Sequence, residues 1–191
     1  MAKAGLLFPF TFLAALSGCD QLGGFDRTKA LDILQNTELP DTSRVPIKRS
    51  TVDCLLNGGY LTTFMGASWT ITPNGKAFIN AFDYNVFGGE GFLTFAPGAK
   101  LADAQVTGIG PASQGPSSGA ATSDAVKQIE FTAHYDLSSV SNGASAPDCL
   151  TTSPATAGKA IAKKYDDGWR IEFTQLPPIV DASEQKQGTI Q

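Results

Sequence analysis

The sequence has little of what redox enzymes, metal sites and nucleic-acid-binding proteins need. Its 191 residues include one histidine and three cysteines, and no two cysteines have CxxC spacing. A thiol-redox site usually has that spacing, and a structural zinc site needs several nitrogen or sulfur ligands. We therefore predict no cofactor and no metal. Positive charge is also scarce, since 14 lysines and arginines stand against 18 aspartates and glutamates. This balance argues against nucleic acid and against a polybasic contact with anionic lipid.

Long apolar runs are scarce as well. The run from Gly5 to Leu16 has about 12 residues, whereas a membrane-spanning helix takes about 20. Lys3 precedes it and small residues follow it, an arrangement that is typical of a signal peptide. Its ending, Leu16-Ser17-Gly18-Cys19, resembles the lipobox of bacterial lipoproteins. The resemblance implies that the leader, residues 1–18, is removed and that Cys19 becomes the lipidated first residue.

Lipidation of Cys19 would anchor the protein in a membrane, with its domain on the periplasmic side of the bacterial cell envelope. By the same resemblance, the cysteine carries a diacylglyceryl group and usually a third acyl chain. Asp20 resembles an inner-membrane retention signal of enterobacterial lipoproteins, which slightly favours the inner membrane and leaves the outer membrane open. The alternative is a plain signal peptide whose cysteine is incidental.

Two cysteines remain once Cys19 is assigned to the lipid. The envelope permits disulfides, so Cys54 and Cys149 are predicted to form one bridge that closes a loop of about 95 residues. The alternative is two separate buried thiols.

The mature chain reads as a tether, residues 19–25, followed by a single globular domain, residues 26–176. Asp26 is a candidate N-cap, and the apolar spacing after it predicts a helix over 27–36. Residues 50–57 are either a second short helix or an edge strand. Residues 110–123 and 138–157 are expected to be flexible loops, and 177–191 a disordered tail.

Most of the domain reads as antiparallel strands. Pro73-Asn74-Gly75 and Gly88-Gly89 mark turns, residues 128–137 alternate between apolar and polar, and Asp166-Asp167-Gly168 turns a final hairpin. We expect an α+β fold with the N-terminal helix packed on an antiparallel sheet of about five to six strands. An all-β sandwich or a small barrel is the alternative.

The final hairpin carries a second resemblance. Its sequence, Tyr165-Asp166-Asp167-Gly168-Trp169-Arg170-Ile171, is similar to the last hairpin of small envelope lipoproteins with a cystatin-like or NTF2-like fold. The resemblance covers this hairpin alone and transfers no functional residue.

Candidate chemistry is sparse. Gly115-Pro116-Ser117-Ser118-Gly119 matches G-x-S-x-G, but a nucleophile elbow needs a strand before it and a helix after it, whereas this stretch reads as a low-complexity loop. His134 shares the polar face of its strand with Glu130, Thr132 and Asp136, a pattern that is more typical of a solvated strand face. A hydrolase using Ser117 or His134 is therefore a remote alternative, and no catalytic residue is predicted.

Two function classes fit better. The first is a non-catalytic accessory lipoprotein, attached to the membrane by its lipid and binding an envelope protein. The second is a small-molecule binder that uses an aromatic pocket in the concave face of the sheet. If the side chains of Trp69, Phe82 and Tyr135 fill that face and leave no cavity, this alternative is excluded.

Overall fold

Antiparallel strands make up about half of the described chain, with a few short helices between them. The computed structural model describes residues 24–65, 68–111, 126–140, 145–151 and 154–180. The helices are α1 (Arg27–Asn36), α2 (Arg49–Asn57) and α3 (Asp148–Thr151), with a 3₁₀ turn, η1 (Gly75–Ala77). The strands are β1 (Val45–Lys48), β2 (Leu61–Phe64), β3 (Ser68–Ile71), β4 (Ile79–Asn85), β5 (Glu90–Phe95), β6 (Lys100–Pro111), β7 (Val126–Asp136), β8 (Thr156–Tyr165) and β9 (Gly168–Gln175).

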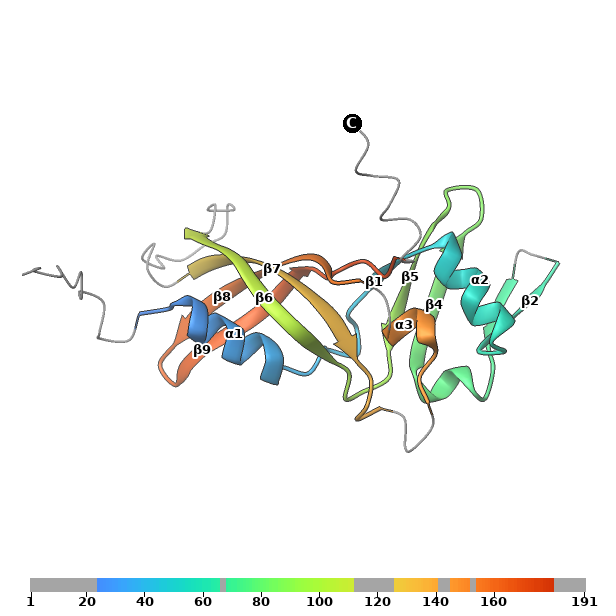
Figure 1. Cartoon of the computed structure of the whole chain (residues 1–191), viewed down its shortest axis with the longest axis horizontal. Coiled ribbons are helices and arrows are strands. Elements are labelled where there is room, and N and C mark those ends of the chain that lie inside the picture. The colour runs from blue at the N-terminus through green and yellow to red at the C-terminus, as the bar shows by residue number, and fades with distance from the viewer. Residues whose placement is uncertain (1–23, 66–67, 112–125, 141–144, 152–153, 181–191) are drawn as a thin grey trace, which may run out of the picture.

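The described strands form three sheets: a four-stranded sheet of order β6-β7-β8-β9, a three-stranded sheet of order β1-β5-β4, and the β2–β3 hairpin. Figure 1 shows the four-stranded sheet and α1 in one half of the molecule, and α2, α3 and the other sheets in the other half. The prediction of a mixed, mainly antiparallel fold is confirmed, but the strands do not lie in one sheet of five to six. The chain changes sheet at Pro97-Gly98, where Gly98 takes a φ of +100° that favours glycine.

Helix α1 confirms the helix predicted over 27–36. The Asp26 side chain caps it by accepting a hydrogen bond from the Lys29 backbone N–H at 2.8 Å. The helix contacts β6 and β9, the two outer strands of the four-stranded sheet, so that sheet curls around it. The Phe25 ring, just before the helix, packs on Trp169 of β9 at 4.6 Å between centroids. The chain therefore enters the domain close to the β8–β9 turn.

The segment over 50–57, which the sequence left open, is helix α2. Two glycines end it: Gly59 takes a φ of +72°, and the Tyr60 N–H donates to the Leu55 carbonyl at 2.9 Å. This hydrogen bond satisfies a carbonyl that the last turn would otherwise leave without a partner.

Strand β1 was not expected, because Pro46 lies inside it. Proline lacks an N–H and is tolerated in a strand only where no ladder donor is required. Here Pro46 lies opposite Phe92 of β5, and its carbonyl accepts the Ile179 N–H at 2.9 Å. The proline therefore takes part in the sheet through its acceptor alone.

Strands β7, β8 and β9 agree with what the sequence predicted. Ile129, Phe131, Ala133 and Tyr135 of β7 are buried, in the alternation that was predicted. Strands β8 and β9 pair from Tyr165↔Gly168 outward, which confirms the final hairpin. The predicted loop 138–157 is shorter than expected, because it contains α3 and because β8 begins at Thr156.

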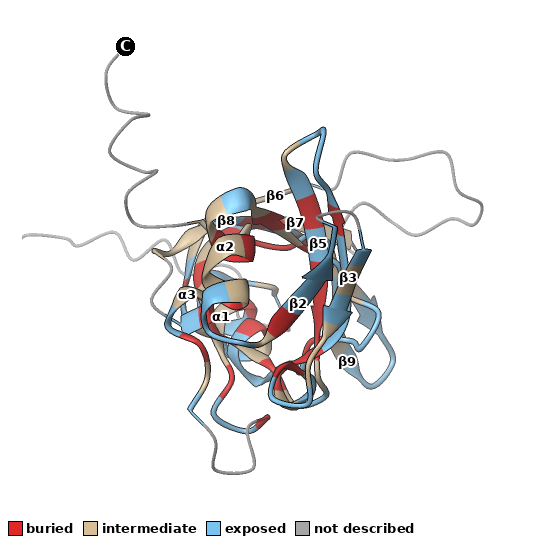
Figure 2. Cartoon of the chain, turned by 90° about the vertical axis from the view of Figure 1, so that its right-hand side faces the viewer, coloured by how far each residue is buried: buried red, intermediate tan, exposed pale blue. Residues whose placement is uncertain are grey.

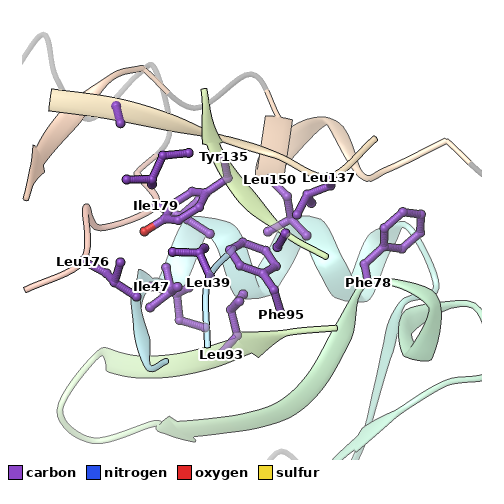
Figure 3. Close-up of a cluster of buried hydrophobic side chains, with 14 of the residues drawn as sticks. Leu39, Ile47, Phe78, Leu93, Phe95, Tyr135, Leu137, Leu150, Leu176 and Ile179 are labelled. Carbon is purple, nitrogen blue, oxygen red and sulfur yellow. The ribbon is translucent and has the colours of Figure 1, made fainter. Parts of the chain in front are cut away.

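One core joins the two halves. Side chains from the three-stranded sheet, the four-stranded sheet and the segment after β9 converge in it, among them Ile47, Phe95, Tyr135 and Ile179 (Figure 3). Figure 2 shows the buried residues gathered inside the molecule, with the hairpin ends exposed. The predicted disordered tail differs from the structure at its start, because Ile179 is fully buried and Pro177 accepts a hydrogen bond from the Tyr135 hydroxyl.

Candidate functional site

Two hairpin tips present large apolar side chains to solvent. The exposed fractions are 70% for Phe64 and 86% for Met65, at the end of β2, and Phe87 in the β4–β5 turn is fully exposed. Single exposed apolar residues are common, but a group of them marks an interaction surface in a folded domain. We call these three residues the apolar end.

The two tips belong to the same end of the molecule. Trp69, next to the β2–β3 tip, packs edge-to-face on Tyr84 and Phe82 of β4, with ring centroids 5.7 and 5.9 Å apart. Tyr84 is close to the β4–β5 tip, so this contact brings the two hairpins side by side. Figure 1 shows both hairpins in the half of the molecule away from α1.

The backbone fixes how these side chains are displayed. The Asn85 side chain accepts hydrogen bonds from the N–H groups of Phe87 at 3.0 Å and Gly88 at 3.2 Å. Met65 takes a φ of +52°, a left-handed conformation that is costly for a residue with a long side chain. A preorganised turn loses less entropy when it binds a partner.

A groove of about 570 Å³ lies along the outer edge of β9, and we call it the β9 groove. One wall is formed by residues 171–176; the other by Phe92 and part of the segment 37–46 that follows α1. The Arg44 guanidinium lies 4.4 Å from the centre of the Phe92 ring and 3.6 Å from the Asp83 carboxylate. A Glu172 carboxylate oxygen is 2.6 Å from the Lys163 ammonium, and this hydrogen bond raises the pKa of Lys163.

His134 lies half-buried on the face of β7 that also carries Glu130 and Thr132, as the alternation indicated. Glu130 lies opposite Lys159 of β8, and the two charged groups approach to 3.7 Å. This cross-strand ion pair is the arrangement expected of a solvated strand face. In the described part of the chain, no cluster of three or more His, Cys, Asp or Glu could hold a metal ion.

Trp69, Phe82 and Tyr135, the three aromatic residues on which the aromatic-pocket alternative was to be tested, lie in two separate clusters. Trp69 and Phe82 pack on each other, while Tyr135 is buried against Phe95 at 4.9 Å between centroids. Burial raises the pKa of the Tyr135 hydroxyl well above its ordinary value. The structure therefore does not bring Trp69, Phe82 and Tyr135 to a common surface.

Cys54 in α2 and Cys149 in α3 lie at disulfide distance, with their Cα atoms 6.3 Å apart. Cys19 and its leader lie outside the described residues, as does Ser117 with the G-x-S-x-G stretch. No helix among the described residues is both long and apolar enough to cross a membrane.

Sequence reasoning missed both the apolar end and the β9 groove. The turn glycines beside Phe87 signalled a hairpin tip, but no sequence signal joins segments as distant as 37–46 and 171–176. Comparison of the chain with models of known families, with curated proteins and with solved structures found no match.

Proposed function

We propose that the protein is a lipid-anchored, non-catalytic interaction module of the bacterial cell envelope, which presents its apolar end to a partner protein. The lipobox-like ending at Cys19 supports the anchor. One observation carries the proposal of a partner: Phe64, Met65 and Phe87 are exposed together on two adjacent hairpin tips.

The place where the chain enters the domain sets the orientation of the module. Between Cys19 and Phe25 the chain reaches about 20 Å when fully extended. Phe25 packs on Trp169, so a lipid on Cys19 keeps the β8–β9 turn near the membrane. The β2–β3 and β4–β5 hairpins, whose tips carry the apolar end, lie in the other half of the molecule (Figure 1). A membrane that holds the β8–β9 turn would therefore lie on the far side from the apolar end. A protein in the periplasm therefore fits this surface better than the anchoring bilayer does.

The other candidate functions have less support. The aromatic-pocket alternative gains no support from Tyr135, which is buried against Phe95, or from Trp69 and Phe82, which pack on each other. A hydrolase would need a base beside its nucleophile, and Glu130 and Asp136, the two carboxylates on the strand face of His134, already bond to Lys159 and to the Ser138 N–H.

Site-specific photo-crosslinking in cells tests the proposal. A photoreactive phenylalanine analogue at Phe87 should give a discrete protein adduct, and Phe87→Ser combined with Phe64→Ser should abolish co-purification of that protein. Tyr165 is the matched control, because it is an exposed aromatic residue in the β8–β9 hairpin (43% exposed). Only lipid adducts at Phe87, or the same protein adduct from both positions, would contradict the proposal. Both Ser variants should keep the wild-type unfolding midpoint, since neither side chain is buried.

A further inference from the structure

Strand β9 leaves one side of its backbone open. It is the last strand of the four-stranded sheet, and its described neighbour is β8. The two-residue turn after Tyr165 places the pair Tyr165↔Gly168 in a hydrogen-bonded position, and such pairs alternate along a hairpin. Ile171 and Phe173 fall between these pairs, so their N–H and C=O groups point away from β8. Among the described residues, no backbone group from outside the sheet bonds to them.

This open edge runs along the β9 groove. Ile171 and Phe173 both line the groove, and a bulge at Thr174 ends the regular pairing just beyond them. The opposite wall contains Pro40 and Pro46, which have no N–H to offer an incoming chain. A chain entering the groove therefore finds its backbone partners on β9, and on the other side it meets Phe92 and the two prolines together with polar side chains that include Arg44.

We propose that the β9 groove binds an extended segment of a partner protein, which adds to the four-stranded sheet as a further strand and places an acidic side chain against Arg44. In this mode, backbone hydrogen bonds supply affinity and alternate side chains supply specificity. The site is separate from the apolar end and does not depend on the lipid anchor.

The charges in the groove select the acidic side chain. Arg44 is the one cationic residue among those that line it, and its guanidinium lies over the Phe92 ring. Its partner Asp83 is 3.6 Å away with a side chain that is 80% exposed, a pairing that solvent weakens. The other charged lining residue, Glu172, already pairs with Lys163. Of the two charged side chains in the groove, that of Arg44 is therefore the one that a ligand can pair with, and its charge is positive.

Two other occupants fit less well. The C-terminal tail would have to reverse its direction to enter the groove. Ile179 pairs with Ile47 in a parallel bridge, so the chain at Ile179 runs in the direction from Arg44 to Lys48. A second copy would have to bring a whole four-stranded sheet to a groove of about 570 Å³.

The probe is a set of synthetic peptides selected from a random linear phage library on the mature chain, residues 19–191, carrying Cys19→Ala. We expect the selected peptides to share an acidic residue. Arg44→Gln should weaken their binding about tenfold or more, because it removes a charge-assisted hydrogen bond. Ile171→Pro should weaken it about fivefold, because it removes an outward N–H and leaves the ladder to β8 intact. The matched control is Lys164→Gln, on the same hairpin but outside the groove, which should leave binding unchanged.

Hydrogen exchange of the Ile171 and Phe173 amides provides a direct readout, and a selected peptide should slow both at least about tenfold. Peptides that bind Arg44→Gln and wild-type protein equally well would overturn the proposal, as would a selection that yields no binder. Slow exchange without peptide would also overturn it. If that exchange becomes fast on truncation after Val180, the tail is the occupant; if it depends on protein concentration, a second copy is. Should Ile171→Pro fail to fold, Arg44→Gln still decides the outcome.

Discussion

Removing the pairing of Cys54 with Cys149 should destabilise the domain more than most point substitutions would. The two residues join α2 to α3, and 95 residues of sequence separate them. Their Cα separation of 6.3 Å falls within the range that a disulfide spans without movement of the backbone. The bridge would therefore restrict a large part of the unfolded chain at little cost to the folded one.

The magnitude follows from the length of the closed loop. In the chain-entropy model, a loop of about 95 residues loses about 16 cal/mol/K when it is closed, or about 4.7 kcal/mol at 25 °C. Measured losses for native disulfides run from about 2 to 5 kcal/mol. At about 2–4 °C per kcal/mol for a domain of this size, the midpoint of thermal unfolding should fall by roughly 8–16 °C for a loss of about 4 kcal/mol.

The assay compares Cys54→Ser, Cys149→Ser and the double variant in a Cys19→Ala background, which removes the third thiol. Each single variant should be about as unstable as the double, because either one removes the same bridge. The Cys19→Ala parent, heated with and without reductant, is the control. Reduction should lower its midpoint of thermal unfolding by as many degrees as the serine substitutions do.

Two results would refute this reasoning. One is two free thiols per chain in the denatured, unreduced parent, which would show that the bridge does not form. The other is a double variant whose midpoint lies within about 1 °C of the parent, since a loop of this length cannot be released without a larger change.

Three further predictions concern the anchor and the core. Cys19→Ala should move the protein from the membrane to the soluble fraction or block its processing, without changing its unfolding midpoint; unchanged fractionation would refute the lipobox reading. Burial raises the folded-state pKa of Tyr135, so the stability it contributes is complete below pH about 10 and is lost as pH rises further; Tyr135→Phe should flatten that alkaline loss in denaturant titrations. Gly158→Ala would place a methyl group 2.6 Å from the buried Phe131 ring and should cost about 1–3 kcal/mol in chemical denaturation. Gly110→Ala is its control, because a methyl group there meets nothing within 4 Å.

Local sequence signals located most of the helices and strands. The Asp26 cap, the alternation through β7 and the turn at Asp166-Asp167 each act within a few residues, so each was predicted at about the right place. The misses also have local reasons. Pro46 hid β1, because a proline usually argues against a strand, and α3 is only four residues long, too short for a helical period to be visible.

The sequence by itself determined that this chain forms mainly antiparallel strands with a short capped helix before them, and that the stretch ending at Cys19 resembles a lipobox. Those properties depend on neighbouring residues and on composition. Only the tertiary structure decided how the strands divide among three sheets, because register and sheet order depend on contacts between distant segments. For the same reason, only the structure revealed the exposed apolar end and the β9 groove. Whether Phe87 or Ile171 is buried or exposed depends on what the rest of the chain leaves uncovered.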